Sequence, residues 1–393
     1  MALSVDRNVH AVAECPTSLG AALPELSEPA QVRGVIDCVG TQLRNNARYV
    51  VGGSGVGAIV GATTGLGMAR GLLLGASTGA VFGVRAGRAR LHGAVGQVGV
   101  VGAHEVPTAT PAATETLRVM EFNVHGGMGG PGKFFATPAK LELLAETIRQ
   151  EQPDIVLLQE LDNCAVRSNF VDTLCQLVKR LHPTGAVMTP AIEKVNGRRE
   201  GTGVMTFHGG TITDARGLRI GDALGDDFGR RFRATADAWA GVASNKLRRP
   251  WLPFGGTKEY QPRVATDVMV RTVAGNHIRV MSGHFSPPQH GIDEPKRQIE
   301  PVVATVATWP GPTIFGADFN TRDGSAEFVR EHAVFAAAGL TESTAGAPPN
   351  SDRVYASAHF SAANPRKLLV PDGAVRASDH YPVVVELTLH AIA

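Results

Sequence analysis

Apolar runs alternate with helix-period segments over the C-terminal two-thirds of the chain. The first run, LRVMEF at 117–122, predicts a strand. Residues 138–150 then carry apolar side chains at the three- and four-residue spacing of an amphipathic helix. DIVLLQ at 154–159 is almost continuously apolar, which is typical of a strand buried on both faces. These elements predict the strand–helix–strand beginning of an α/β domain.

The same alternation continues to the end of the chain. Further strand-like runs are VATDVMVRTV, HIRVMSGHF, TIFGADF, RVYAS and YPVVVELTL. Helix-like segments at 169–181, 295–307 and 326–337 separate several of these strands, and no internal repeat is visible. We therefore predict one α/β domain over residues 117–393.

Residues 49–102 follow a different pattern, because glycine recurs there at every fourth position. The recurring positions are Gly53, Gly57, Gly61 and Gly65, then Gly67, Gly71, Gly75, Gly79, Gly83 and Gly87. Residues four apart share one face of a helix, so each run leaves a stripe against which another helix packs closely. Each interior glycine costs about 1 kcal/mol relative to alanine, so close packing or lipid must offset the loss. The pattern predicts a glycine-zipper helical hairpin.

Charge around this glycine-zipper segment leaves two interpretations. No acidic residue occurs from Cys38 to His104, and residues 49–69 carry no charge at all. At about 1.5 Å per residue, that stretch is just long enough to cross a hydrocarbon core of about 30 Å. We favour membrane association through residues 49–87, with self-oligomerisation as a soluble element as the alternative. A membrane-associated or secreted location is accordingly favoured over a cytoplasmic one.

The segments that flank the glycine-zipper segment are polar. Residues 1–48 are predicted to be partly disordered, and they lack the apolar region of a cleavable signal peptide. Residues 103–116 include HEVPTATPAATET, a composition typical of a linker. The net charge of +2 excludes a strongly basic nucleic-acid coat protein and an acidic, solvating protein. Four cysteines without a C-x-x-C pair exclude a disulfide scaffold and a zinc knuckle.

Polar side chains stand at the ends of the predicted strands, where open α/β sheets carry their reactive groups. In chain order the candidates are Asn123, Glu160, His284, Asp318, Asn320, Asp352, Asp379 and His380. Carboxylate and amide oxygens without thiolates suit a hard cation such as Mg²⁺ or Mn²⁺. A histidine next to an aspartate offers proton handling. The set supplies what metal-assisted hydrolysis at phosphorus needs: a Lewis acid, an activated water and donors to the developing charge.

Six strings in this order resemble motifs of the endonuclease/exonuclease/phosphatase superfamily, the fold of pancreatic-type deoxyribonuclease and bacterial sphingomyelinase. The strings are FNVHGG, LLQELDNCAVRS, SGHF, GADFN, SDRVYAS and SDHYPV. They span the chain from residue 117 to its end. The resemblance implies a four-layered α/β-sandwich, with two mixed β-sheets packed between helices. It also implies a hydrolase of phosphoester bonds that depends on Mg²⁺ or Mn²⁺.

The resemblance implies roles for individual residues as well. Glu160 and Asp379 would bind the divalent ion, with Asn123 close by. Asp318 would orient or deprotonate the attacking water. Asn320 would hold a phosphate oxygen of the substrate.

The remaining implied roles concern two histidines and an arginine. Asp352 would pair with His380 and keep it cationic toward the phosphate, while His284 would act as an acid or as a donor to the leaving oxygen. Arg263 is either a phosphate clamp or a surface arginine. The string REGTGVMTF departs from the family, since Thr202 stands where many members have an aromatic residue. A phosphate-contacting tyrosine is therefore absent or supplied elsewhere.

Residues 216–263 are long, irregular and basic, and we expect this segment to set substrate specificity. Its cations and aromatic residues include Arg230, Arg231, Arg233, Lys246, Arg248, Arg249, Lys258, Trp239, Trp251 and Phe254. Such a mixture suits a nucleic-acid backbone with stacked bases, an anionic lipid surface, or an ordinary solvated loop. We predict a nuclease-type phosphodiesterase, with DNA or RNA favoured over phospholipid. The alternatives are a sphingomyelinase-like phospholipase C, a phosphoinositide phosphatase, or a toxin or effector that delivers this domain.

Overall fold

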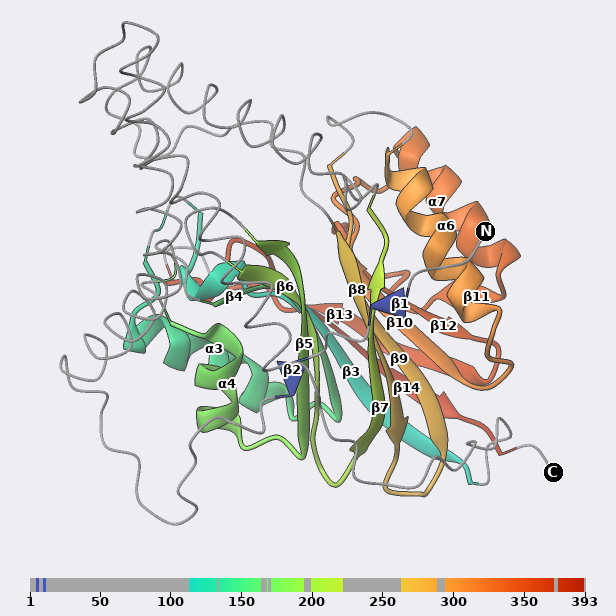
Figure 1. The fold of residues 1–393 in the computed structure, drawn as a ribbon, viewed down its shortest axis with the longest axis horizontal. Coiled ribbons are helices and arrows are strands. Elements are labelled where there is room, and N and C mark those ends of the chain that lie inside the picture. Colours follow the sequence, from blue (N-terminus) through green and yellow to red (C-terminus); the bar gives the residue numbers. More distant parts are fainter. Residues whose placement is uncertain are drawn as a thin grey trace, which may run out of the picture.

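The protein was analysed as a computed structural model, which describes residues 5–6, 10–11, 113–131, 133, 135–163, 168, 171–193, 199–221, 263–287, 294–370 and 374–391. These residues form two β-sheets that lie face to face between two pairs of helices (Figure 1). The predicted glycine-zipper hairpin and residues 222–262 of the predicted specificity segment lie outside the described residues.

The first sheet is built around the two strands that the apolar runs predicted. Within the described residues its order is β13 (Phe360–Lys367), β14 (Val383–Leu389), β3 (Glu115–Asn123), β4 (Ile155–Asn163), β6 (Arg199–Thr206), β5 (Gly185–Glu193) and β2 (His10–Ala11). β3 and β4 pair in parallel, because helix α3 (Pro138–Glu151) carries the chain back between them. Strand β3 begins two residues before the predicted run, inside the segment expected to be linker.

The second sheet holds the remaining strands. Among the described residues its order is β1 (Val5–Asp6), β7 (Thr211–Arg219), β8 (Val264–Arg271), β9 (His277–His284), β10 (Thr313–Asp318), β12 (Asp352–Ser357) and β11 (Leu340–Glu342). β9 and β10 pair in parallel around helix α6 (Glu294–Val306), and the other neighbours are antiparallel. Both sheets are therefore mixed, as predicted.

Three apolar layers hold the sandwich together. Leu157 and Val280 belong to the core between the two sheets. Helices α3 and α4 (Thr173–Leu181) cover the outer face of the first sheet, where Leu144 is fully buried. Helices α6 and α7 (Ala326–Ala337) cover the second sheet, and the ring of Phe335 stacks on Tyr355 with centroids 4.7 Å apart. Each fully buried side chain of this size contributes about 1.5–3 kcal/mol. The four-layered α/β-sandwich is confirmed.

Capping side chains fix where the predicted helices begin. Thr137 accepts a hydrogen bond from Lys140 N (3.3 Å), and Pro138 follows it at the first helical position. Ser325 caps α7 in the same way, so that helix matches its predicted range. The helix predicted at 169–181 starts only at Thr173, because the carboxylate of Asp172 accepts from Cys175 N (2.9 Å).

The start of β3 is anchored by a side chain from the second sheet. Ala113 N donates to Asn276 Oδ1 (3.1 Å), and Asn276 Nδ2 donates back to Ala113 O (2.8 Å). This pair mimics a step of backbone strand pairing. Residues 115–116 therefore belong to the sandwich, and the linker predicted at 103–116 is too long at its C-terminal end.

One more prediction about an irregular region needs correction. Residues 216–219, expected in an irregular segment, form the end of β7, since Ile220 N and Gly221 N both donate to Arg263 O. Within the segment 1–48, the described residues add β1 to the edge of β7 and β2 to the edge of β5, and the predicted partial disorder of this segment stays a prediction. Such short strands satisfy backbone groups that an exposed sheet edge leaves unpaired.

Two further features bear on the sequence-based expectations. Cys175 in α4 is disulfide-bonded, and the other three cysteines of the chain lie outside the described residues. In the part of the chain that the structure describes, no helix has both the length and the apolar character to cross a membrane. The segment predicted to associate with membranes, 49–87, lies outside the described residues, so its membrane association stays a prediction.

Candidate active site

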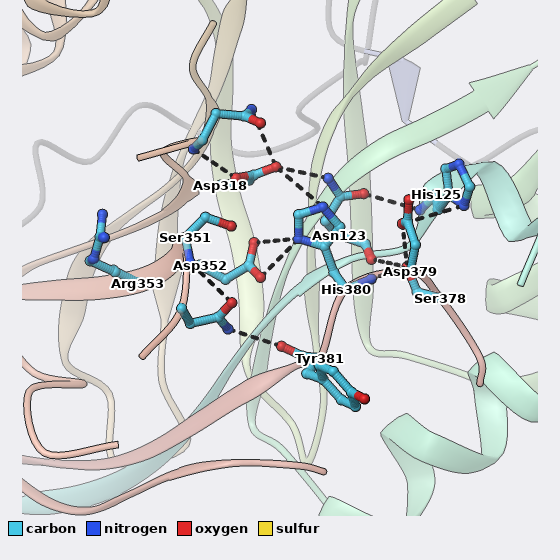
Figure 2. Close-up of polar contacts among 12 residues, drawn as sticks. Asn123, His125, Asp318, Ser351, Asp352, Arg353, Ser378, Asp379, His380 and Tyr381 are labelled. Atoms are coloured by element: carbon cyan, nitrogen blue, oxygen red, sulfur yellow. Dashed lines mark hydrogen bonds and ion pairs between the residues drawn. The ribbon is translucent and has the colours of Figure 1, made fainter. Parts of the chain in front are cut away.

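Strand register alone places three of the predicted site residues side by side. In the parallel pair β9–β10, Asp318 lies opposite His284, and in the antiparallel pair β10–β12 it lies opposite Asp352. Asn123 ends β3 in the facing sheet and donates from Nδ2 to Asp318 Oδ2 (3.1 Å). Both sheets therefore deliver polar side chains to one edge of the sandwich (Figure 2).

Asp318 is the centre of this cluster. Its side chain is only 1% exposed, and its Oδ2 lies 3.4 Å from His284 Nε2 and 3.7 Å from His380 Nε2. Asn320 donates from its backbone N to Oδ1 (2.8 Å). Burial raises the pKa of Asp318, but His380, His284 and the hydrogen bonds from Asn320 and Asn123 together hold it below its usual value of 3.8. The carboxylate is therefore ionised at neutral pH.

His380 and Asp352 form a charged pair. His380 Nδ1 lies 2.9 Å from Asp352 Oδ2 and 3.1 Å from Oδ1 (Figure 2). Burial opposes the charge of His380, yet the carboxylates of Asp352 and Asp318 raise its pKa to about 11. Burial raises the pKa of Asp352 to about 6. At pH 7 the imidazolium therefore donates from Nδ1 to Asp352, and its Nε2–H faces Asp318.

His284 faces the same carboxylate but has the opposite protonation. Burial, followed by the charge of Arg263, lowers the pKa of His284 to about 3. Its Nε2 lies 3.1 Å from Asn320 Nδ2, which also donates to Phe285 O (2.9 Å). The neutral ring therefore accepts from Asn320, so the geometry favours a role in positioning Asn320 over the acid role that the resemblance implied.

Arg263 is not a surface arginine. Its residue is only 5% exposed, and it directly precedes β8 beside the end of β7. Its positive charge acts on His284, as the pKa of that ring shows. The sequence left two roles open for Arg263, a phosphate clamp or a surface arginine. Its burial excludes the surface arginine, and the phosphate clamp stays a prediction.

The three predicted metal ligands converge on the end of β3. Asn123 Nδ2 lies 3.4 Å from Glu160 Oε1. Ser378 donates to Asn123 O (2.7 Å), which brings the next residue, Asp379, to the same place with its side chain 32% exposed. Glu160 lies within a register shift between Leu158 and Leu161 in the pairing of β4 with β6. The bulge gives Glu160 an orientation that a regular strand would not.

A second group of potential ligands lies within the acid–base cluster itself. Ligand atoms of Asp318, Asp352 and His380 lie within 4.8 Å of one another. A histidine that binds a metal must offer a neutral nitrogen, whereas His380 carries its proton between two carboxylates. The oxygen donors of Glu160, Asp379 and Asn123 fit Mg²⁺ or Mn²⁺ better, because these ions prefer carboxylate and amide oxygens.

Sequence reasoning missed two residues of the site. His125 Nδ1 lies 3.3 Å from Asp379 Oδ1 and 3.1 Å from Gly129 O. Its place in the string FNVHGG, two residues after Asn123, was the available signal. Glu121 is fully buried beneath the cluster, and neither carboxyl oxygen has a hydrogen-bond partner within the described part of the chain. A charged residue inside the apolar run LRVMEF was the signal there.

The environment of Glu121 disfavours its negative charge. Burial raises the pKa of Glu121 well above its usual value of 4.5, and the nearby carboxylates of Asp352 and Asp318 raise it further.

Three residues at this edge adopt left-handed backbone conformations that side chains rarely tolerate. His125, Glu160 and Asn320 have φ values of 49°, 51° and 55°. Such a conformation costs about 1–3 kcal/mol and persists only where the surrounding structure holds it. Each one follows the end of a strand or a bulge, so the strain turns polar side chains toward the common site.

Comparisons with known proteins agree with this architecture. The model of the Endonuclease/Exonuclease/phosphatase family matches residues 120–380. An endonuclease/exonuclease/phosphatase from Beutenbergia cavernae shares 19% identity and a TM-score of 0.50, over 70% of this chain and 72% of that one. A family protein from Bacteroides thetaiotaomicron shares 14% identity and a TM-score of 0.49, over 71% and 99% of the two chains.

A mannosyl-6-phosphatase from Bacteroides thetaiotaomicron shares 14% identity and a TM-score of 0.47, over 69% of this chain and 99% of that one. No protein with a curated description matches the chain. The Beutenbergia cavernae structure, at 19% identity, bears on the fold alone, whereas the family model covers the site residues from Asn123 to His380. The chain belongs to the endonuclease/exonuclease/phosphatase family.

Proposed function

We propose that this protein is a divalent-metal-dependent phosphodiesterase that hydrolyses its substrate with an activated water. One observation carries the proposal: an ionised, buried Asp318 that faces a cationic His380 and a neutral His284 at one sheet edge. Groups with opposed protonation around a single reaction centre are what general acid–base chemistry requires. Family membership supports hydrolysis of phosphoester bonds as the reaction class.

Glu160 and Asp379, with Asn123 between them, would hold Mg²⁺ or Mn²⁺. A bound cation of this kind supplies Lewis-acid stabilisation of the charge on a phosphoryl oxygen. His125 contacts Asp379 from the outer side and Ser378 holds the adjoining backbone against Asn123. These contacts fix the direction of the Asp379 carboxylate before any ion binds.

Asp318 is the group that would orient the attacking water. The amides of Asn123 and Asn320 hold its carboxylate, so one oxygen lone pair keeps a fixed direction for a water proton. Its depressed pKa makes it a weak base but a permanently ionised acceptor. Orientation of the water is therefore its main contribution, with proton transfer completed as the new bond to phosphorus forms.

His380 would stabilise negative charge on the phosphoryl group. Asp352 holds Nδ1–H and so fixes both the orientation and the charge of the ring. Its Nε2–H then points to the space beside Asp318. A fixed cationic donor at that point stabilises the transition state without reorganising. Arg263, which is buried and whose charge acts on His284, is our candidate for a second contact to a phosphate oxygen.

The full-length chain tests this proposal with bis-p-nitrophenyl phosphate as substrate. We expect turnover with Mg²⁺ or Mn²⁺ and loss of turnover in EDTA that is restored by the metal. Glu160→Gln should raise the metal concentration needed for half-maximal activity, and Asp318→Asn should lower kcat. Glu142→Gln, on the exposed side of α3, is the matched control. Equal turnover in EDTA would contradict the metal mechanism.

DNA or RNA is the substrate class that we propose to test first. The support is in the sequence of residues 222–262, where cations alternate with aromatic side chains. Phospholipid is the second candidate, supported by the glycine repeat that predicts membrane association. Plasmid DNA, an RNA oligomer, sphingomyelin vesicles and phosphoinositide vesicles should be incubated in parallel. Release of lipid phosphate with intact DNA and RNA would reverse the order.

The proposed membrane association has its own test. Residues 49–87 are expected to hold the expressed protein in the membrane fraction after carbonate extraction. Full recovery in the soluble fraction would leave self-oligomerisation through the glycine zipper as the remaining proposal. Sedimentation of the full chain against one that lacks residues 49–87 then measures the oligomer directly.

A further inference from the structure

We propose that Asp323, Arg353 and Asn350 form a positioning unit, which sets the loops that carry Asn320 and His380 and thereby the rate of hydrolysis. The inference rests on the proposed function, because it assigns these residues to the geometry of that site. None of the three lies among the residues proposed to touch substrate or metal. Each acts through a neighbour.

The sheet explains the positions of only part of the acid–base cluster. Backbone pairing between β10 and β12 ends at Asp318 and Asp352, the last residues in register. One further backbone bond, from Phe319 N to Ser351 O (2.9 Å), joins the two chains beyond the ladder. Asn320 already lies in the following loop, and His380 lies in the loop before β14. These two residues need other supports.

Asp323 connects the loops from both sides. Its Oδ1 accepts from Arg353 Nη2 (2.6 Å) and Nε (3.1 Å), which is the two-nitrogen geometry that a guanidinium offers. Its Oδ2 accepts from Asn350 N (3.2 Å). One carboxylate therefore joins the loop after β10 to the residues that lead into β12.

Arg353 holds the segment between Asn320 and Asp323 in place. Its Nη2 donates to Thr321 O (2.9 Å) and its Nη1 to Thr321 Oγ1 (3.1 Å). The guanidinium also lies over the Phe328 ring, with Cζ 4.6 Å from the centroid. Asn320 is the residue next to Thr321, so these bonds limit how far its left-handed backbone can relax.

Asn350 carries the connection to His380. Its Nδ2 donates to Tyr381 O (3.1 Å), in the residue after His380. On the other side, His380 N donates to Ser378 Oγ (3.2 Å). The histidine is thus held through its backbone from both flanks, and through its ring by Asp352.

The burial of Arg353 argues that this arrangement serves geometry. Its side chain is 1% exposed while its partner Asp323 is 35% exposed. Replacing a buried ion pair by apolar residues is often neutral for stability, so the main role that we assign to this pair is geometric. Here the direction of the guanidinium fork sets Thr321 and Asp323 together, which a leucine or methionine would not do.

A double-mutant cycle tests the proposal, with bis-p-nitrophenyl phosphate and Mg²⁺ or Mn²⁺ as the assay. Asn350→Ala should lower kcat by about 10-fold with KM unchanged, since sub-ångström displacement of catalytic groups has effects of this order. In a His380→Gln background, the same substitution should lower kcat by less than about 2-fold, because it acts through His380. Asp323→Asn weakens both arms, so it should lower kcat in the wild-type background and still lower it, through Asn320, in the His380→Gln background.

Asn276→Ala is the matched control, because it removes side-chain hydrogen bonds at the opposite end of β9. Asn276→Ala should leave kcat unchanged even if it lowers the melting temperature as much as Asn350→Ala does. If Asn350→Ala lowers kcat equally in both backgrounds, or leaves kcat unchanged, the positioning unit is refuted.

A second readout does not depend on activity. His380 Nδ1 lies 2.9 Å from Asp352 Oδ2. The proton shared between these two atoms should give a downfield NMR signal in the ¹⁵N-histidine-labelled full chain. Asn350→Ala should move or broaden this signal, and Asn276→Ala should not. If the wild-type protein hydrolyses no phosphodiester, the proposed function fails, while this signal still decides whether Asn350 positions His380.

Discussion

His284 and His380 approach the same oxygen of Asp318, yet the fold gives them opposite charges. His380 has a carboxylate on its far nitrogen, and its pKa rises to about 11. His284 is more deeply buried, and burial, followed by the charge of Arg263, lowers its pKa to about 3. Proximity to one aspartate therefore does not decide protonation. A second carboxylate decides the charge of His380, and burial decides that of His284.

This difference assigns separate tasks to the two sides of the site. The side formed by β12 and the loop before β14 supplies a fixed positive charge. The side formed by β9 and the loop after β10 supplies neutral hydrogen bonds that hold Asn320. An anionic phosphoryl group would therefore bind against the first side and be oriented by the second.

The largest effect on kcat is expected from Asp318, which both histidines approach. Asp318→Asn should lower kcat by about 10³-fold, which is within the range for removal of a general base. The pKa of His380 should also fall, because one of its two carboxylate neighbours is lost. Steady-state kinetics and NMR titration measure the two results. A kcat within about 3-fold of the wild type would show that Asp318 does not act on the water.

The two histidines themselves should differ in importance. His380→Gln should lower kcat by about 10²-fold, because it removes the fixed cation. His284→Gln, which keeps a polar side chain of similar reach, should cost less than about 10-fold. Asp352→Asn should also lower kcat, since the pKa of His380 falls and the ring loses the contact that fixes its orientation. Equal losses of kcat in the His284 and His380 variants would contradict the separate roles of the two histidines.

The stability of the two variants should respond to pH on opposite sides of neutrality. The pKa of His380 is raised from 6.5 to about 11, so its contribution to stability is complete below pH 6.5 and is lost as pH rises toward 11. The pKa of His284 is lowered from 6.5 to about 3, so its contribution is present above pH 6.5 and is lost as pH falls toward 3.

Urea denaturation should show both slopes. His380→Gln should flatten the decline of unfolding free energy between pH 7 and 10, and His284→Gln should flatten the decline below pH 6.5. Asp352, whose pKa is raised to about 6, opposes the second slope in the wild type, so each variant is compared with the wild type at every pH. Identical pH profiles for both variants would contradict the assignment.

The smallest effect is expected from Arg263→Met. Loss of the positive charge should raise the pKa of His284 only part of the way to 6.5, because burial remains the larger cause. The pKa of His380 should not move, since Arg263 is not among the groups that shift it. If Arg263 also contacts phosphate, KM should rise several-fold. NMR titration of both rings separates these outcomes.

The parts of the fold with strong apolar patterns were predictable from sequence. The strands at β3, β4, β9, β10, β12 and β14 and helices α3, α6 and α7 all follow from apolar runs or helical spacing. Strands β7 and β13 gave no such signal, because TITDARGLR is mostly half-exposed and FSAANPRK lies on an exposed sheet edge. Edge strands are specified by their neighbours more than by their own residues.

The residues of the site also differ in how far they could be predicted from the sequence. Residues at strand ends could be placed from sequence, because a sheet brings those ends to one edge. The pairing of Asp323 with Arg353 could not, since the partners are separated by thirty residues and their burial is a tertiary property. The opposite charges of the two histidines were equally hidden. His284 follows a short apolar run and His380 precedes one, and only the packed structure shows which ring has a carboxylate at its Nδ1.

The left-handed residues at the catalytic edge have a consequence for the engineering of this chain. Glycine adopts such backbone angles without penalty, so Glu160→Gly or Asn320→Gly would relieve local strain. Each would also remove a side chain that we propose to bind the metal ion or a phosphate oxygen. The domain therefore forgoes stability where its chemistry is located, and screens for thermal resistance would select against its activity at these two positions.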